Sequence, residues 1–180
     1  MKLIECPRDA MQGLTEFVPT DVKINYLNQL LKVGFDTLDF GSFVSPKAIP
    51  QMRDTAEVVE KLDLSSTKTK LLAIVANVRG AEEALTFEQI SYLGFPLSVS
   101  ETFQLKNTNK TIEQAFGEVS EIQNECLKSG KQLVIYLSMG FGNPYGDRYS
   151  PEIVEQFTER LVGMNIGIIA PSDTIGSSTT

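Results

Sequence analysis

The stretch Ile4-Glu5-Cys6-Pro7-Arg8-Asp9-Ala10-Met11-Gln12 decides how this chain of 180 residues is interpreted. A short apolar strand is predicted over residues 3–6, and an arginine, an aspartate and a glutamine follow almost at once. Parallel α/β proteins place ligands and catalytic groups just beyond the carboxyl ends of their strands. A chain of this class should therefore repeat the pattern of an apolar strand that ends in polar residues.

The rest of the sequence does repeat it. Further strands are predicted at residues 37–40, 71–75, 89–93, 132–139 and 166–170, and helices at 20–33, 51–62, 81–86, 111–129 and 150–164, with a long loop over 95–110. This alternation predicts an α/β fold with a parallel sheet and right-handed crossovers. The six strands and five helices fall short of an eight-stranded barrel, which takes about 250 residues. We expect residues 1–180 to form a single domain.

Composition and charge exclude several classes of protein. The net charge of −7 argues against a nucleic-acid binder, which needs clustered Lys and Arg. No window approaches the roughly 18 apolar residues of a membrane span, and charged residues interrupt the amino terminus before a secretory signal could form. The sequence therefore predicts a soluble, cytoplasmic protein.

Two residue types limit the available chemistry. Cys6 and Cys126 are the only cysteines, too few for a disulfide framework and without metal-ligand spacing, so reduced thiols are expected. The chain has no histidine, which removes the commonest general base and the commonest transition-metal ligand. Acid and base catalysis would have to use carboxylates, lysine, tyrosine or cysteine.

Three carboxylates stand at predicted strand ends: Asp9, Asp39 and Asp173. Parallel topology would place them on one rim, where converging carboxylates suit a hard divalent cation and an adjacent arginine suits an enolate oxygen. Each has a structural alternative. Arg8 and Asp9 could form a simple ion pair, Asp39 could be a paired buried acid, and Asp173 could cap a turn.

Other polar strand ends are less specific. Asn77 follows the strand at 71–75 and is a candidate to contact a ligand. Gly140, Gly142 and Gly146 do not have the dinucleotide-binding spacing, and Pro144 interrupts them, which indicates a tight turn rather than a nicotinamide site.

Together these residues resemble the hydroxymethylglutaryl-CoA lyase family of metal-dependent TIM barrels. The resemblance rests on four segments: Arg8-Asp9 with Gln12, the stretch from Ser42 to Met52 that includes Ser42-Phe43-Val44-Ser45-Pro46-Lys47, the Asn143-Pro144-Tyr145 turn, and Ser172-Asp173-Thr174-Ile175-Gly176. The segments occur in order and with compatible spacing along the whole chain. The resemblance therefore implies a (β/α)8 barrel of which this chain holds about two thirds, without the last strands and helices.

The resemblance also implies roles for individual residues. Asp9 would ligate Mg²⁺ or Mn²⁺, and Arg8 would stabilise the enolate oxygen. Asp39, which stands where the family usually has glutamate, would be a catalytic residue with Arg8. Asp173 would be an acid/base residue. Gln12, Ser42, Asn77 and Thr174 would help to hold the substrate.

The reaction implied is a metal-assisted retro-Claisen cleavage of 3-hydroxy-3-methylglutaryl-CoA into acetyl-CoA and acetoacetate. The family's His-x-His metal ligands, a downstream asparagine ligand and a loop with a catalytic cysteine have no counterpart in these 180 residues. We therefore expect weak metal binding and poor turnover from this chain.

Two alternatives remain open at the level of sequence. The first is a related acyl-CoA condensing synthase or carboxyltransferase, which would share Arg8 and Asp9. The second is a non-catalytic α/β binding module in which the strand-end acids are solvated caps. In each case the expected partners exclude nucleic acid and membrane. Unpaired edges at the first and last strands predict a homodimer or other self-association.

Overall fold

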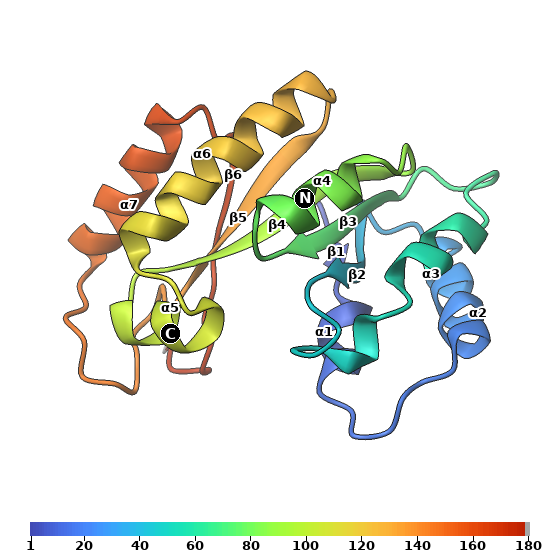
Figure 1. The fold of residues 1–180 in the computed structure, drawn as a ribbon, viewed down its shortest axis with the longest axis horizontal. Helices are drawn as coiled ribbons and strands as arrows, with labels where there is room; N and C mark the ends of the chain where they lie inside the picture. The colour runs from blue at the N-terminus through green and yellow to red at the C-terminus, as the bar shows by residue number, and fades with distance from the viewer. Residues whose placement is uncertain (179–180) are drawn as a thin grey trace. The chain divides into compact units, whose positions relative to one another are not determined.

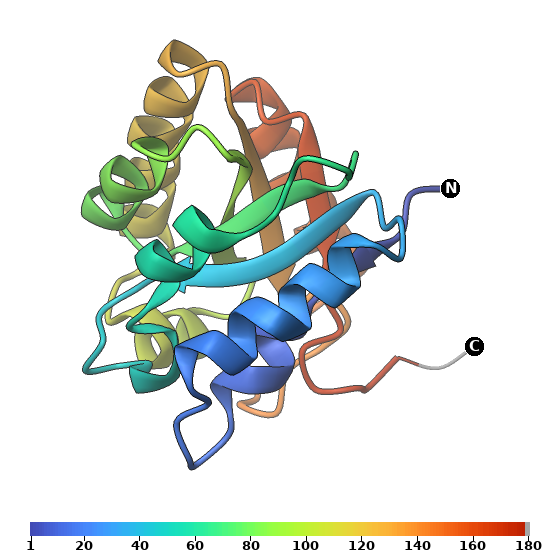
Figure 2. The same ribbon diagram turned by 90° about the vertical axis from the view of Figure 1, so that its right-hand side faces the viewer.

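The computed structural model describes residues 1–178 and divides the chain into two compact units, residues 1–93 and the residues from Gly94 onward. The elements of the first unit are β1 (Ile4–Glu5), α1 (Pro7–Gln12), α2 (Thr20–Leu31), β2 (Thr37–Phe43), the 3-10 helix η1 (Pro50–Met52), α3 (Thr55–Lys61), β3 (Lys70–Val75) and α4 (Val78–Leu85). β1 pairs with β2 and β2 with β3, both in parallel. In this unit α2 lies beside α3 and along β2 (Figures 1 and 2).

The second unit alternates in the same way. Strand β4 (Ile90–Ser98) begins in the first unit and ends in the second, and α5 (Glu101–Thr108), α6 (Ile112–Lys128), β5 (Gln132–Ser138), α7 (Pro151–Gly163) and β6 (Ile168–Pro171) follow. β5 and β6 pair in parallel. Helices α6 and α7 lie side by side, with the rings of Phe116 and Phe157 5.4 Å apart (Figure 1). Among residues 1–178, no helix is both long enough and apolar enough to span a membrane.

Each unit buries the apolar face of its helices against its strands. In the first unit the fully buried residues include Leu27 of α2, Val59 of α3 and Leu72 of β3. In the second they include Ile122 of α6 and Ile135 of β5. Strands β3 and β5 are almost continuously apolar, as expected of parallel strands covered on both faces.

Several predicted boundaries were wrong. The described residues hold seven α-helices rather than five, because no helix was predicted at α1 and α5 lies within the predicted loop over 95–110. Residues 95–110 form the end of β4 and then α5, whose first turn is capped by the Ser100 hydroxyl. β2 continues through Phe43, so Ser42 lies in a strand rather than in a loop.

Thr20 is the first residue of α2, and Pro19 occupies the N-cap position without a side-chain hydrogen bond. The Thr20 hydroxyl instead donates to Asp54 across 2.8 Å. Asp54 also pairs with the buried ammonium of Lys23 at 2.7 Å. Satisfying this buried pair takes precedence over capping the helix, because unpaired buried charges are far more costly than a missing cap.

The start of α4 approaches the end of β2 so closely that only glycine fits. A Cβ on Gly80 would lie 2.2 Å from the carbonyl oxygen of Phe43. The Asn77 side chain accepts from the Gly80 N–H at 2.8 Å and holds this turn in place. Gly80 therefore fixes the distance between the end of β2 and the helix that follows β3.

We predict that Gly80→Ala destabilises the chain by about 1–3 kcal/mol, since the added carbon must displace backbone. The matched control is Gly117→Ala in the middle of α6, where a Cβ meets nothing within 4 Å. That change should stabilise the chain by about 0.5–1 kcal/mol. Urea unfolding of both variants is the measurement, and equal effects on the free energy of unfolding would contradict the close approach.

Candidate active site

The sequence from Cys6 to Gln12 turns at once from strand into helix. Cys6 precedes α1, and Pro7 occupies its first position, where a missing N–H costs nothing. Pro7 and Met11 are buried, which leaves Arg8 and Gln12, one turn apart, on another side of the helix. Nη1 of Arg8 donates to Oε1 of Gln12 at 2.9 Å. The short helix thus presents Arg8 and Gln12 together just beyond β1.

A β-bulge in β2 puts Asp39 and Ser42 on the same face of the sheet. Asp39 lies opposite Leu72, and Ser42 lies opposite Ile74, with a shift in register between Asp39 and Gly41. Residues three apart in a regular strand point to opposite faces, but the bulge adds one residue and restores the alignment. Gly41 faces the other way, where a Cβ would meet the Thr55 side chain of α3 at 2.6 Å.

The centre of the site is the ion pair between Arg8 and Asp39. Nε of Arg8 lies 3.2 Å from both carboxylate oxygens of Asp39, and Nη2 lies 2.6 Å from Oδ2. Asp39 is 0% exposed and the Arg8 side chain 12% exposed. Burial raises the pKa of Asp39, and the Arg8 hydrogen bonds oppose that rise. Such an arrangement immobilises a permanently charged guanidinium at the solvent boundary, where it can stabilise an anion.

Asp9 is the outward-facing carboxylate of the cluster. Its side chain is 68% exposed and accepts from Nη1 of Arg8 at 2.9 Å. Among residues 1–178, no three or more His, Cys, Asp or Glu side chains lie together as metal ligands. The described residues therefore offer Asp9 as a single possible ligand and do not by themselves fit a divalent ion.

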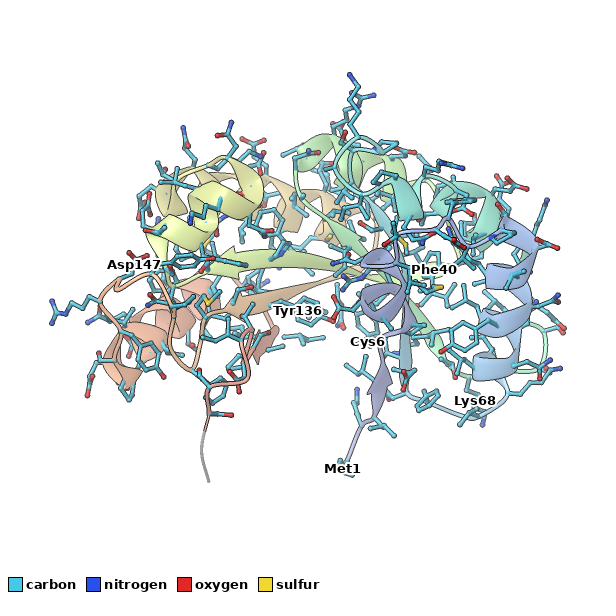
Figure 3. The ribbon with its side chains drawn as sticks, turned by 90° about the horizontal axis from the view of Figure 1, so that it is seen from below. Met1, Cys6, Phe40, Lys68, Tyr136 and Asp147 are labelled. Atoms are coloured by element: carbon cyan, nitrogen blue, oxygen red, sulfur yellow. The ribbon has the colours of Figure 1, made fainter. Side chains whose placement is uncertain are left out.

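The thiol of Cys6, labelled in Figure 3, adjoins this cluster. Burial, with Asp39 as the next cause, raises its pKa to about 11. A thiol with that pKa stays protonated at neutral pH, and thiolate is the reactive form. Cys6 therefore fits the structural role expected of a cysteine beside an apolar strand.

Two other residues predicted to contact a ligand, Asn77 and Ser42, have different surroundings in the structure. Asn77 is the N-cap of α4, with its oxygen committed to Gly80. Ser42 is 2% exposed, and its hydroxyl has no hydrogen-bond partner among the described residues. A buried hydroxyl without a partner is unfavourable, so Ser42 is the better candidate to bind a substrate oxygen or a water molecule.

Asp173 and Thr174 lie in the second unit. The Asp173 carboxylate accepts from the Ser178 hydroxyl at 2.7 Å and from the backbone N–H groups of Ser178 and Ser177 at 3.0 and 2.8 Å. These hydrogen bonds, led by that of the Ser178 hydroxyl, lower the pKa of Asp173 to about 2. The Thr174 hydroxyl accepts from the N–H of Met139 at 2.8 Å. Asp173 thus caps a turn here and is poorly suited to release or take up a proton near neutral pH.

Sequence reasoning missed both the bulge and the direct contact of Arg8 with Asp39. Gly41 was the available signal for the bulge, because an isolated glycine in a strand pattern indicates a bulge or a close backbone approach. Asp147 was also missed. It anchors the loop after β5 to the start of α5 through Ser100 and Thr102, and sequence spacing gives no sign of a contact 45 residues apart.

Known proteins of similar sequence are hydroxymethylglutaryl-CoA lyases, although no protein-family model matches the chain. The human cytoplasmic 3-hydroxy-3-methylglutaryl-CoA lyase is 33% identical over 186 residues, which cover 99% of this chain and 48% of the human protein. Hydroxymethylglutaryl-CoA lyase YngG of Bacillus subtilis is 34% identical over 172 residues, which cover 96% of this chain and 57% of that enzyme. The chain spans about half the length of the curated relatives it matches.

The comparison with solved structures agrees with the sequence similarity. An HMG-CoA lyase from Acinetobacter baumannii, in complex with coenzyme A and 3-methylmalate, superimposes with a TM-score of 0.92 at 32% identity. The match covers 99% of this chain and 58% of that one. It confirms the predicted α/β fold class, a TIM barrel present in part. The predicted resemblance is confirmed as well: by sequence and by fold, this chain is similar over nearly its whole length to hydroxymethylglutaryl-CoA lyases.

Proposed function

We propose that this chain supplies the part of the active site that contains Arg8 in a lyase. The lyase would cleave 3-hydroxy-3-methylglutaryl-CoA into acetyl-CoA and acetoacetate. The observation that carries the proposal is the Arg8 guanidinium, which is fixed by buried Asp39 and by Gln12 yet remains partly exposed. The names of the relatives favour a lyase over a condensing synthase or a carboxyltransferase. The complex of the A. baumannii lyase with coenzyme A supports an acyl-CoA as the substrate class.

The chemistry needs a positive group at the thioester oxygen. A base removes the proton of the tertiary hydroxyl, and the bond between the tertiary carbon and the carbon next to the thioester carbonyl breaks. The tertiary carbon becomes the ketone of acetoacetate, and the electron pair forms the enolate of acetyl-CoA, whose carbon is then protonated. Arg8 would donate hydrogen bonds to the enolate oxygen as negative charge develops there. Because Asp39 already holds the guanidinium in place, little reorganisation is needed during the reaction. Asp39 would act as a positioning residue that does not touch the substrate.

The other proposed roles have less structural support than that of Arg8. Ser42 and Gln12 are proposed to hold the substrate, Ser42 through its buried hydroxyl and Gln12 from its place beside Arg8. Asn77 and Thr174 are weaker candidates, because both already make local hydrogen bonds. The acid/base role proposed for Asp173 would require the turn at residues 177–178 to open.

We propose divalent-ion binding only for a protein in which further residues ligate the ion together with Asp9. Residues 1–178 bring one exposed carboxylate to the site, and the neighbouring Asp39 is buried against Arg8. For this reason no step above is assigned to Mg²⁺ or Mn²⁺. The cytoplasmic location stays a prediction, since the relatives include both cytoplasmic and mitochondrial lyases.

The proposal is tested by incubating the chain with 3-hydroxy-3-methylglutaryl-CoA and Mn²⁺ and measuring acetoacetate. We expect slow turnover that Arg8→Lys lowers by about 10²–10³-fold in kcat/KM, because lysine cannot form the double contact with Asp39. Arg53→Lys is the matched control, since Arg53 lies over the Phe17 ring and should leave the rate unchanged. If the unaltered chain forms no acetoacetate, the non-catalytic binding module becomes the better hypothesis for these 180 residues.

A second prediction concerns the metal. With one carboxylate ligand, Mn²⁺ should bind with a Kd above about 1 mM, weaker than sites built from several oxygen ligands. Asp9→Asn should weaken it further, and EDTA should leave the thermal midpoint unchanged. Electron paramagnetic resonance titration and thermal unfolding measure these effects. Micromolar binding that survives Asp9→Asn would show that the ion is held elsewhere.

A third prediction concerns pH. The pKa of Asp173 in the folded chain lies below its unfolded value, so its hydrogen bonds stabilise the fold above the ordinary aspartate range. This stabilisation is lost as the pH falls toward about 2. Ser178→Ala removes the leading donor and should raise the pKa of Asp173 toward its ordinary value in a carboxyl NMR titration. Ser120→Ala, on the exposed face of α6, should not change it. An unaltered pKa in Ser178→Ala would contradict the capped turn.

A further inference from the structure

The loop between β5 and α7 contains a segment, residues 143–148, that is held together by internal hydrogen bonds of the Asn143 side chain. The Asn143 side chain donates to the carbonyl of Asp147 at 3.0 Å. Its Oδ1 accepts from the backbone N–H groups of Tyr145 and Asp147 at 3.0 and 3.1 Å. Gly142, with φ of +119°, stands immediately before this segment, which we term the strap. These bonds make the strap one small structural piece, bounded on one side by a flexible residue.

One side chain of the strap, that of Asp147, accepts several hydrogen bonds from the start of α5. The Asp147 carboxylate, labelled in Figure 3, accepts from the Ser100 hydroxyl at 2.5 Å and from both the N–H and the hydroxyl of Thr102 at 2.9 Å. These donors surround the first turn of α5, where backbone N–H groups favour a negative charge. Hydrogen bonds to a carboxylate are about twice as strong as neutral ones.

The other contacts of the strap go to the same helix. The Tyr145 ring lies 6.4 Å from the ring of Phe103, and the Lys106 ammonium lies 4.5 Å from the centre of the Tyr145 ring. Tyr145 is 37% exposed, so this contact excludes little water. The carboxylate of Asp147 is therefore the strongest attachment between the strap and α5 among the described contacts.

We propose that Asp147 is a latch, and that the strap opens from α5 as a unit when the latch is released. Because Asn143 closes the strap on itself, its internal hydrogen bonds survive the opening while those to Thr102 and Ser100 break. Local openings of this kind occur well below the free energy of global unfolding. The strap carries the exposed Tyr145, so its opening changes the surface beyond the end of β5.

Amide hydrogen exchange of the full chain by NMR tests the latch. In Asp147→Ala the Thr102 amide should exchange about tenfold faster or more, because its acceptor is gone. The amides of Tyr145 and Asp147 should keep their protection, since Asn143 still binds them. Asn143→Ala should do the reverse, exposing the two strap amides and sparing Thr102.

Two further variants serve as controls that distinguish local opening of the strap from a general loss of stability. Asp147→Asn keeps the shape and one acceptor, and should accelerate exchange at Thr102 less than Asp147→Ala does. Glu155→Gln removes an exposed carboxylate from α7 and should change none of these amides. The latch is disproved if Thr102 exchange is unchanged in Asp147→Ala. It is equally disproved if the amides of β5 and α7 accelerate by the same factor as Thr102.

Discussion

The buried carboxylate of Asp39 is the constraint on which the candidate site depends. A charge at 0% exposure is unstable unless a cation meets it, and Arg8 does so from α1 through Nε and Nη2. This requirement draws α1 against β2 and so orders Gln12 and Asp9 as well. The ion pair between Arg8 and Asp39 therefore links the helix after the first strand to the second strand, and it leaves the Arg8 guanidinium partly exposed to solvent.

Local signals were enough for the regular parts of the fold. Strand β3 and helices α6 and α7 lie where the sequence predicts them. A capping box of Thr111 and Gln114 begins α6, and Pro151 is the first residue of α7. Segments whose conformation depends on tertiary contacts were predicted poorly. α1 has six residues, too few for helical periodicity to appear, and β4 runs through Gly94 and Pro96, which normally interrupt strands.

The sequence offers the residues of the candidate site as candidates, but it does not predict how they are arranged. Arg8, Asp9 and Asp39 were identified from their positions at strand ends, yet the alternative of a simple Arg8–Asp9 pair understated the contact with Asp39. Asp173 follows the structural alternative, since it caps a turn at Ser177 and Ser178. The similarity to the lyases covers nearly the whole chain and about half the length of each relative.

The bulge in β2 also has a consequence for how this strand can change in evolution. Asp39 and Gly41 pair with the adjacent residues Leu72 and Ala73, so Phe40 is the extra residue between them. A relative without that residue would have a regular strand, and its counterparts of Asp39 and Ser42 would still face the same way. The extra residue, Phe40, is only 2% exposed, and its side chain packs in the core. The separation of two site residues along a sequence can therefore differ between homologous strands while their separation in space is kept.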